Sequence, residues 1–221
     1  EFRRVLFRSG PLVAAAVWVD DRILGLLEAI GARDSKAVTD ASIPGLAASI
    51  REIGGDGVAV VTIAPARYNV MQAEMAGQGR NLNDLVAWAH ATAITQVRAA
   101  RPASRAVVDR FADPRHLDAA LRRRGGDPLE VLHAPRAEAN LAVAAASILA
   151  RAGFLAWFGG AGRRWGMDLP LGASDAVVAA GKRFVAKHGV GPLPEVAKLH
   201  FRTTLSVAPG LAKASPAPDP A

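Results

Sequence analysis

One stretch, Glu138 to Arg151 (EANLAVAAASILAR), most constrains how this chain can fold. Small and aliphatic residues occupy almost every face of it, which is typical of a helix packed closely against a sheet. At about 100° per residue, Asn140, Ser147 and Arg151 fall within roughly 20° of one line along such a helix. The stretch therefore predicts a central helix with a single narrow polar face.

Glu138 stands just before the regular helical run, and two interpretations of it are open. A carboxylate near the first turn of a helix interacts favourably with the positive end of the helix dipole, so Glu138 can be a terminal acid with no further role. Because helical periodicity does not determine its direction, Glu138 can equally point at a binding site.

The composition of the 221 residues limits the classes of function. A hydrophobic content of 51% supports one sizeable core, so we expect one main domain. The chain has no cysteine and five scattered histidines, which excludes disulfides and thiolate zinc sites and indicates a reducing, cytoplasmic setting. The formal net charge of +7 favours a polyanionic partner such as nucleic acid.

Two long apolar runs raise the question of a membrane span. Residues 11–19 follow three arginines, as in a secretory signal, but the run closes on an Asp20-Asp21 turn, which is typical of a buried strand. Residues 141–158 contain Arg151, whose charge costs about 2.5–3.5 kcal/mol at the centre of a bilayer. We therefore expect no membrane span.

Runs of β-branched residues alternate with helical periodicities along the chain, which predicts an α/β fold. The expected strands are Pro11–Val19, Val58–Ile63, Arg105–Asp109 and Asp127–Leu132. The expected helices are Ile23–Ile30, a helix capped by Thr39 or Asp40 that ends near Ile53, a helix from about Asn83 to Ala100, Asp113–Arg124, the central helix, and a helix capped by Ser174 that ends near His188.

Two acids follow predicted strands. Asp109 ends one buried strand, and Glu138 follows the next strand along the chain. In open α/β sheets ligands collect beyond the carboxyl ends of strands, and two carboxylates there can hold the divalent cations that clamp both oxygens of a phosphodiester displacement. Acids at strand ends also serve solubility, so the spacing alone leaves both interpretations open.

Short motifs along most of the chain occur in the order seen in type 2 ribonucleases H. They are residues 10–17 (GPLVAAAV), 34–36 (DSK), 68–69 (YN), 81–83 (NLN), 108–112 (VDRFA), 136–138 (RAE), 141–151 (LAVAAASILAR), 169–173 (LPLGA) and 197–201 (AKLHF). The chain resembles this family from Gly10 to Thr204, and resembles ribonuclease HIII more than HII because of Glu138 and the AKLHF ending. The resemblance implies an RNase H-like fold in residues 10–205, with a central mixed five-stranded sheet flanked by helices, in a monomer.

The resemblance also implies the site and its partners. Asp109 and Glu138 match two of the family's four metal-binding carboxylates, which hold two divalent ions, Mg²⁺ or Mn²⁺. An RNA/DNA hybrid is the implied partner, because amide, hydroxyl and cationic groups suit contacts to phosphates, sugars and the 2′-hydroxyl. The implied substrate-binding residues are Ser35, Lys36, Asn81, Asn83, Ser147, Arg151 and Lys198.

The first strand departs from the family pattern. The other two carboxylates should stand there as Asp-Glu in a Gly-x-Asp-Glu-x-Gly-x-Gly-Pro segment, and counting back from Gly10 places them at Val5 and Leu6. Residues 1–9 (EFRRVLFRS) instead resemble the in-frame translation of a sequencing-adapter oligonucleotide. We therefore expect residues 1–9 to be foreign, and a separate N-terminal substrate-binding domain, if this lineage has one, to have been lost. Residues 206–221, rich in Ala and Pro, predict a disordered tail.

Two functions of different classes follow. The first is a metal-dependent endonuclease that cuts the RNA strand of RNA/DNA hybrids and is inactive with this N-terminus, because two of its carboxylates are missing. The second is a module that binds hybrids without turnover. Assays of cleavage and of binding on one labelled hybrid distinguish them.

Overall fold

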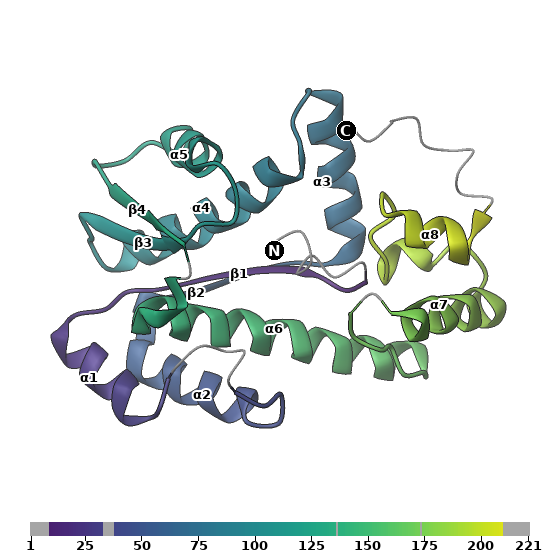
Figure 1. Ribbon diagram of the computed structural model, residues 1–221, viewed down its shortest axis with the longest axis horizontal. Helices are drawn as coiled ribbons and strands as arrows, with labels where there is room; N and C mark the ends of the chain where they lie inside the picture. The colour runs from purple at the N-terminus through teal and green to yellow at the C-terminus, as the bar shows by residue number, and fades with distance from the viewer. Residues whose placement is uncertain (1–8, 33–37, 136, 173, 210–221) are drawn as a thin grey trace. The chain divides into compact units, whose positions relative to one another are not determined.

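The computed structural model describes residues 9–32, 38–135, 137–172 and 174–209 (Figure 1). The chain divides into two compact units, which we describe separately. The sheet unit comprises Val13–Thr62 and Glu74–Ala156, and the helical unit comprises Glu1–Leu12, Ile63–Ala73 and Trp157–Ala221.

The strands form two ladders. β1 (Leu12–Val17) pairs with β2 (Val58–Ile63), and the Trp18 amide donates to the Gly57 carbonyl at 2.7 Å, so the end of β1 lies beside the start of β2, as in an antiparallel pair. β3 (Arg105–Asp109) and β4 (Glu130–Ala134) are parallel, with Asp109 opposite Ala134.

The prediction of a single five-stranded sheet is wrong for the described residues, which carry four strands in two separate two-stranded sheets. β-Branched runs reveal where strands are, but pairing depends on register between distant segments, which local sequence does not contain. β4 also begins later than predicted. Pro128 has no amide to donate, and the Glu130 amide donates to the Ser104 carbonyl at 2.9 Å, at the start of the ladder.

The helices of the sheet unit surround these strands. They are α1 (Asp21–Ala29), α2 (Ile43–Gly54), α4 (Leu82–Ala100), α5 (Pro114–Arg122) and the first part of α6 (Leu141–Trp165), with short 3₁₀ turns at Gly55–Gly57 and Ala137–Ala139. α3 (Pro65–Gly77) contributes its last residues. The predicted cap of α2 by Thr39 or Asp40 is wrong, because α2 begins after Ser42.

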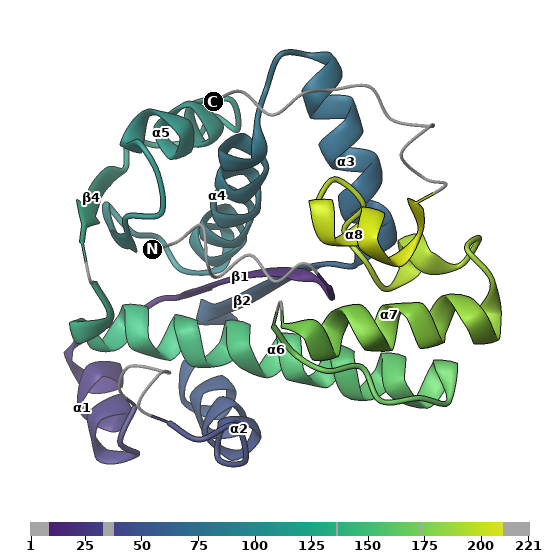
Figure 2. The same ribbon diagram turned by 45° about the vertical axis from the view of Figure 1, so that its right-hand side comes forward.

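The first part of α6 is central to the sheet unit, as its small-residue pattern predicted. Ala145, Ile148 and Leu149 are fully buried in one cluster with residues of α1 and α2. Figures 1 and 2 show this part of α6 between the β1–β2 ladder on one side and α1 and α2 on the other. Packing on two sides explains why almost every face of the helix is apolar.

Gly153 allows the close approach of α6 to the strands. A Cβ added there would lie 3.2 Å from Val13 Cγ1 and 3.6 Å from Val60 Cγ1. We expect Gly153→Val to lower the free energy of unfolding by about 1–3 kcal/mol, because overpacking a filled core forces strain. Gly160→Val, with no atom within 4 Å of its added Cβ, should change it by less than about 0.5 kcal/mol. Urea unfolding followed by circular dichroism measures both, and equal losses would contradict the packing argument.

By length and composition, α6 is apolar enough to cross a membrane, a test that core helices of soluble proteins also pass. Its buried residues pack in the core cluster described above. Arg151, in the interior of the helix, forms an ion pair with Asp40. The absence of a membrane span stays a prediction.

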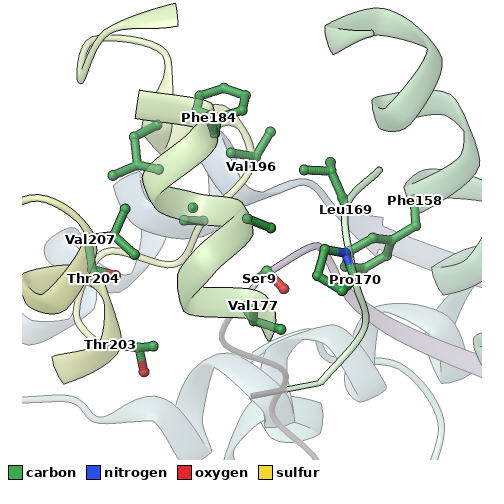
Figure 3. Close-up of a pocket in the computed structure, with 14 residues that line it drawn as sticks. Ser9, Phe158, Leu169, Pro170, Val177, Phe184, Val196, Thr203, Thr204 and Val207 are labelled. Carbon is green, nitrogen blue, oxygen red and sulfur yellow. The ribbon is translucent and has the colours of Figure 1, made fainter. Parts of the chain in front are cut away.

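The helical unit contains the end of α6, the start of α3, α7 (Asp175–His188), a 3₁₀ turn (Leu193–Glu195) and α8 (Arg202–Val207). Phe184, Leu193 and Val196 are buried in its core. The unit has a pocket of about 580 Å³, partly open to solvent and walled mainly by apolar side chains such as Phe158, Val177 and Val207 (Figure 3).

Candidate metal and nucleic-acid site

Asp109 lies where the two parallel strands end. The Arg110 amide donates to the Ala134 carbonyl at 3.1 Å, which keeps the chain beyond β3 beside the chain beyond β4. Asp109 is half-buried, and its Oδ1 accepts a hydrogen bond from the Ala137 amide at 3.3 Å. Strand β3 thus delivers the carboxylate to the edge of the sheet, as its position at a strand end predicted.

Glu138 lies in the 3₁₀ turn Ala137–Ala139, directly before α6. Its backbone follows Ala137, the residue whose amide binds Asp109, while its side chain is outside the described part of the structure. The fold therefore brings the backbone of one predicted carboxylate next to the side chain of the other, although the two residues are far apart in the sequence. Their role as metal ligands stays a prediction.

The donor set limits what this edge can hold. In the described part of the chain no group of three or more His, Cys, Asp and Glu is arranged to hold a metal ion. Mg²⁺ is usually held by one or two carboxylates together with water molecules, and two ions share more such donors than Asp109 alone provides. Within the described residues, the carboxylates at this edge therefore do not make up a two-ion centre.

The predicted substrate-binding residues Asn81 and Asn83 lie exposed at the N-terminus of α4. Asn81 Oδ1 accepts from the Asn83 amide at 2.8 Å, and Asp84 Oδ2 accepts from the Asn81 amide at 2.9 Å. This capping box satisfies two amides that a helix start leaves without partners, so it holds both asparagines in one geometry.

Asp84 also connects α4 to α5. Its Oδ1 lies 3.0 Å from His116 Nδ1, and the two side chains are only 17% and 14% exposed. Burial alone would raise the pKa of Asp84, but the hydrogen bonds from His116 and from the Asn81 amide, with nearby positive charge, outweigh burial and lower the pKa. Asp113 caps α5 by accepting a hydrogen bond from the Arg115 amide at 3.0 Å. The start of α5 is therefore held at two points, by this cap and by the contact between His116 and Asp84.

Arg151 on α6 forms a two-pronged ion pair with Asp40. Arg151 Nε lies 2.9 Å from Asp40 Oδ1, and Nη2 lies 2.7 Å from Oδ2. The hydrogen bond from Arg151 lowers the pKa of Asp40 below its usual value, despite the opposing effect of burial. The guanidinium is therefore partly neutralised within the protein, and its predicted contact with nucleic acid has to compete with Asp40.

The remaining members of the polar face differ in position. Asn140 caps α6, because its Oδ1 accepts from the amides of Ala142 at 3.0 Å and Val143 at 3.4 Å. Ser147 is half-buried on α6, one turn before Arg151. Ser35 and Lys36 lie outside the described residues, so their predicted role in binding stays a prediction.

Lys198 departs from its expected place in a nucleic-acid groove. The residue is only 1% exposed, and its Nζ donates to the Pro11 carbonyl at 3.2 Å. Burial lowers the pKa of Lys198 to about 7. Lysine is usually at the surface, so sequence predicts exposure, and only the packing of distant segments reveals that this ammonium is enclosed.

The depressed pKa of Lys198 predicts a pH-dependent stability. Between pH 7 and the ordinary lysine pKa of 10.5, the unfolded chain holds this proton and the folded chain does not, so stability rises with pH. We expect Lys198→Met to remove about 2–3 kcal/mol of the increase between about pH 7 and pH 9.5. The exposed Lys182→Met is the control, and urea unfolding at both pH values is the measurement. An identical pH dependence in the two variants would refute the prediction.

The ion-pair partners of the predicted site residues cannot be read from the sequence. Asp40 was considered only as a helix cap, and its ion pair with Arg151 spans 111 positions. His116 pairs with Asp84 through the contact between α4 and α5. No local pattern signals such pairs.

Comparisons with known proteins place the chain in a family. The Ribonuclease HII family model matches residues 8–204. The chain is 37% identical over 194 residues to Ribonuclease HIII of Protochlamydia amoebophila, covering 88% of this chain and 62% of that protein. It is 39% identical over 198 residues to Ribonuclease HIII of Chlamydia caviae, covering 88% of this chain and 63% of that protein. The chain thus spans less than two thirds of the length of these relatives.

A solved structure has the same fold. The crystal structure of Bst-RNase HIII in complex with Mn²⁺ matches with a TM-score of 0.83 and 30% sequence identity, covering 95% of this chain and 67% of that one. This similarity confirms the predicted RNase H-like fold. Because the family model spans nearly all of the described residues, and the two curated relatives and the solved structure named above are ribonucleases HIII, the chain belongs to the ribonuclease HII family.

Proposed function

We propose that this chain is the catalytic part of an endoribonuclease that hydrolyses the RNA strand of RNA/DNA hybrids. The observation that carries the proposal is the meeting of Asp109 with the segment of Glu138 at the end of two parallel strands, in a member of the ribonuclease HII family. In a complete site, two divalent ions such as Mg²⁺ or Mn²⁺ would supply the activation of water and the stabilisation of the leaving oxygen. The Mn²⁺ complex of Bst-RNase HIII supports a divalent metal.

With its present N-terminal segment, we propose that the chain binds hybrids with little turnover. Residues 2–9 contain no carboxylate, and Arg3, Arg4 and Arg8 add positive charge to this segment. With Asp109 and Glu138 as the remaining donors, the site lacks the oxygens that two cations need. This observation favours the second function, a hybrid-binding module, for the chain that begins with residues 1–9.

Asp109 and the N-terminus of α4 would have different tasks in this proposal. The Ala137 amide orients the Asp109 carboxylate, which removes a degree of freedom from a group that must hold charge at one place. The capping box fixes the Asn81 side chain and the Asn83 backbone at the surface, where amide groups can contact a 2′-hydroxyl or a phosphate.

Binding and cleavage of one labelled substrate test the proposal. We expect the chain to bind an RNA/DNA hybrid more tightly than duplex DNA of the same sequence, with an affinity that falls as salt increases. In Mg²⁺ or Mn²⁺ it should cut the RNA strand slowly or not at all. Equal affinity for both duplexes, or cutting of DNA, would argue against this substrate class.

The ion pair of Arg151 offers a sharper test of binding. Arg151→Ala should raise the Kd for hybrid by about three- to tenfold and reduce the slope of log K against log salt by about 1, because one phosphate contact is lost. Asp40→Asn is the matched variant: it removes the negative charge paired with the guanidinium and should lower the Kd. If Asp40→Asn leaves affinity unchanged and Arg151→Ala leaves the salt slope unchanged, Arg151 has only a structural role.

A further inference from the structure

Residues 194–199 hold the segment that leads into β1. The Gly10 amide donates to the Val196 carbonyl at 3.0 Å, and Ser9 forms an antiparallel bridge with Ala197. The buried Lys198 reaches the same segment, because its Nζ donates to the Pro11 carbonyl at 3.2 Å. Residues 9–11 are therefore fixed by backbone and side chain together, directly before the first strand.

Asn69 on α3 holds residues 194–199 from the other side. Its Nδ2 donates to the carbonyls of Pro194 at 3.2 Å and Ala197 at 2.9 Å, and its Oδ1 accepts from the Leu199 amide at 2.9 Å. One half-buried amide side chain thus satisfies three backbone groups of a short irregular segment. Such a segment has no ladder of its own to define its shape.

Lys198 is itself held rigidly. Its Nζ lies 5.1 Å from the centre of the ring of Tyr68, a residue with no solvent exposure, and the Thr204 hydroxyl donates to the Lys198 carbonyl at 3.2 Å. A long side chain enclosed in this way has lost its rotamer freedom, so it cannot reach out to nucleic acid. It instead keeps a fixed distance between its own backbone and the Pro11 carbonyl that it binds.

Gly10 completes the arrangement. Its φ of +77° lies in the left-handed region, and a Cβ there would come within 2.3 Å of Phe158 Cε2. The backbone therefore turns sharply against α6 at the point where residues 194–199 hold it. We name residues 9–11, Asn69 and residues 194–199 together the entrance clamp.

We infer that Lys198 and Asn69 are positioning residues: through the entrance clamp they hold the start of the first strand in place, and Lys198 does not contact the hybrid. The inference rests on the proposed function, in which the family's first two carboxylates stand just before Gly10. Misplacing a reacting group by about 1 Å can cost about 10²-fold in rate, so release of the clamp should slow a reaction that uses groups in the segment before Gly10.

The first experiment uses the full chain with its own N-terminal segment. We expect Lys198→Met to speed hydrogen exchange in the peptide that contains Gly10 by about tenfold or more, because the held amide is released. Its Kd for hybrid should stay within about twofold and its salt slope should not change. The exposed Lys182→Met, on α7, should change neither exchange nor slope. A salt slope reduced by about 1 in Lys198→Met would instead make Lys198 a phosphate contact and overturn the inference.

The second experiment separates positioning from general stability. In a chain whose first-strand carboxylates have been restored, Asn69→Ala and Lys198→Met should each lower kcat by about tenfold or more while KM stays within about twofold. Asn69→Asp keeps the acceptor for the Leu199 amide but sets a carboxylate oxygen against the carbonyls of Pro194 and Ala197, so it should lower kcat at least as much as Asn69→Ala. If Lys198→Met fails to fold, Asn69→Ala decides by the same readouts.

The two proposals fail in different ways. Unchanged exchange at Gly10 in both Lys198→Met and Asn69→Ala would overturn the clamp, whatever the chain binds. A parent chain that does not prefer hybrids would overturn the proposed function, while the exchange experiment would still support or refute the clamp.

Discussion

Replacing residues 1–9 with the corresponding segment of the Protochlamydia amoebophila ribonuclease HIII is expected to raise the rate of hybrid cleavage by at least about 1,000-fold, or about 4 kcal/mol of barrier. The family resemblance implies that this segment carries the Asp-Glu pair that is absent at Val5 and Leu6. Two further carboxylates would complete a site that now has two, and removal of Arg3, Arg4 and Arg8 would lower the positive charge of the segment.

A graft of the whole segment suits this test better than substitutions at Val5 and Leu6. Residues 1–8 lie outside the described structure, so the position of each side chain relative to Asp109 is not defined there. Initial rates on a labelled hybrid in Mg²⁺ and in Mn²⁺ measure the effect. The control is the same graft with its Asp-Glu pair changed to Asn-Gln, which should remain inactive. Comparable rates for the original and grafted chains would show that the four-carboxylate assignment is wrong.

Asp109→Asn in the grafted chain is expected to lower kcat by about 1,000-fold or more while the Kd for hybrid stays within about threefold. The substitution removes the charge that would hold a cation, but it keeps the volume and an oxygen that can accept from the Ala137 amide. Glu138→Gln should behave in the same way. Single-turnover rates at saturating enzyme measure the cleavage step without interference from product release.

Asp113→Asn is the matched control for this prediction. Asp113 stands four residues after Asp109 and caps α5 through the Arg115 amide, a task that asparagine performs equally well. We therefore expect its activity within about threefold of the grafted parent. Inactivation by Asp113→Asn with survival of Asp109→Asn would transfer the ligand role to Asp113.

The elements whose signals are local were predicted closely. β2 (Val58–Ile63) and β3 (Arg105–Asp109) have the predicted bounds, because β-branched runs ended by Pro65 and by an acidic turn are self-contained signals. α7 begins after Ser174 and ends at His188, as predicted. The small-residue face of α6 likewise predicted a helix packed closely in the core.

The site was predicted in part. The order of strands and acids placed Asp109 and Glu138 at one sheet edge, because parallel strands bring their carboxyl ends together, and the structure joins Asp109 to the neighbour of Glu138 by a hydrogen bond. The environment of the cationic residues was not predictable. Arg151 is paired with Asp40, and Lys198 is enclosed beside Tyr68, through contacts between segments far apart in the chain.

The sequence by itself determined the strand positions, most of the helices, the acids at the strand ends and the family, since each rests on periodicity or on motifs within about twenty residues. It did not predict the helices α3 (Pro65–Gly77) and α8 (Arg202–Val207). Only the tertiary structure decided that four strands form two separate ladders among the described residues. It also decided that Asp40 forms an ion pair with Arg151 and that Lys198 donates a hydrogen bond to the Pro11 carbonyl. The physical reason is that register, ion pairing and burial each depend on two surfaces that come together in the fold. A single segment of sequence specifies only one of those two surfaces.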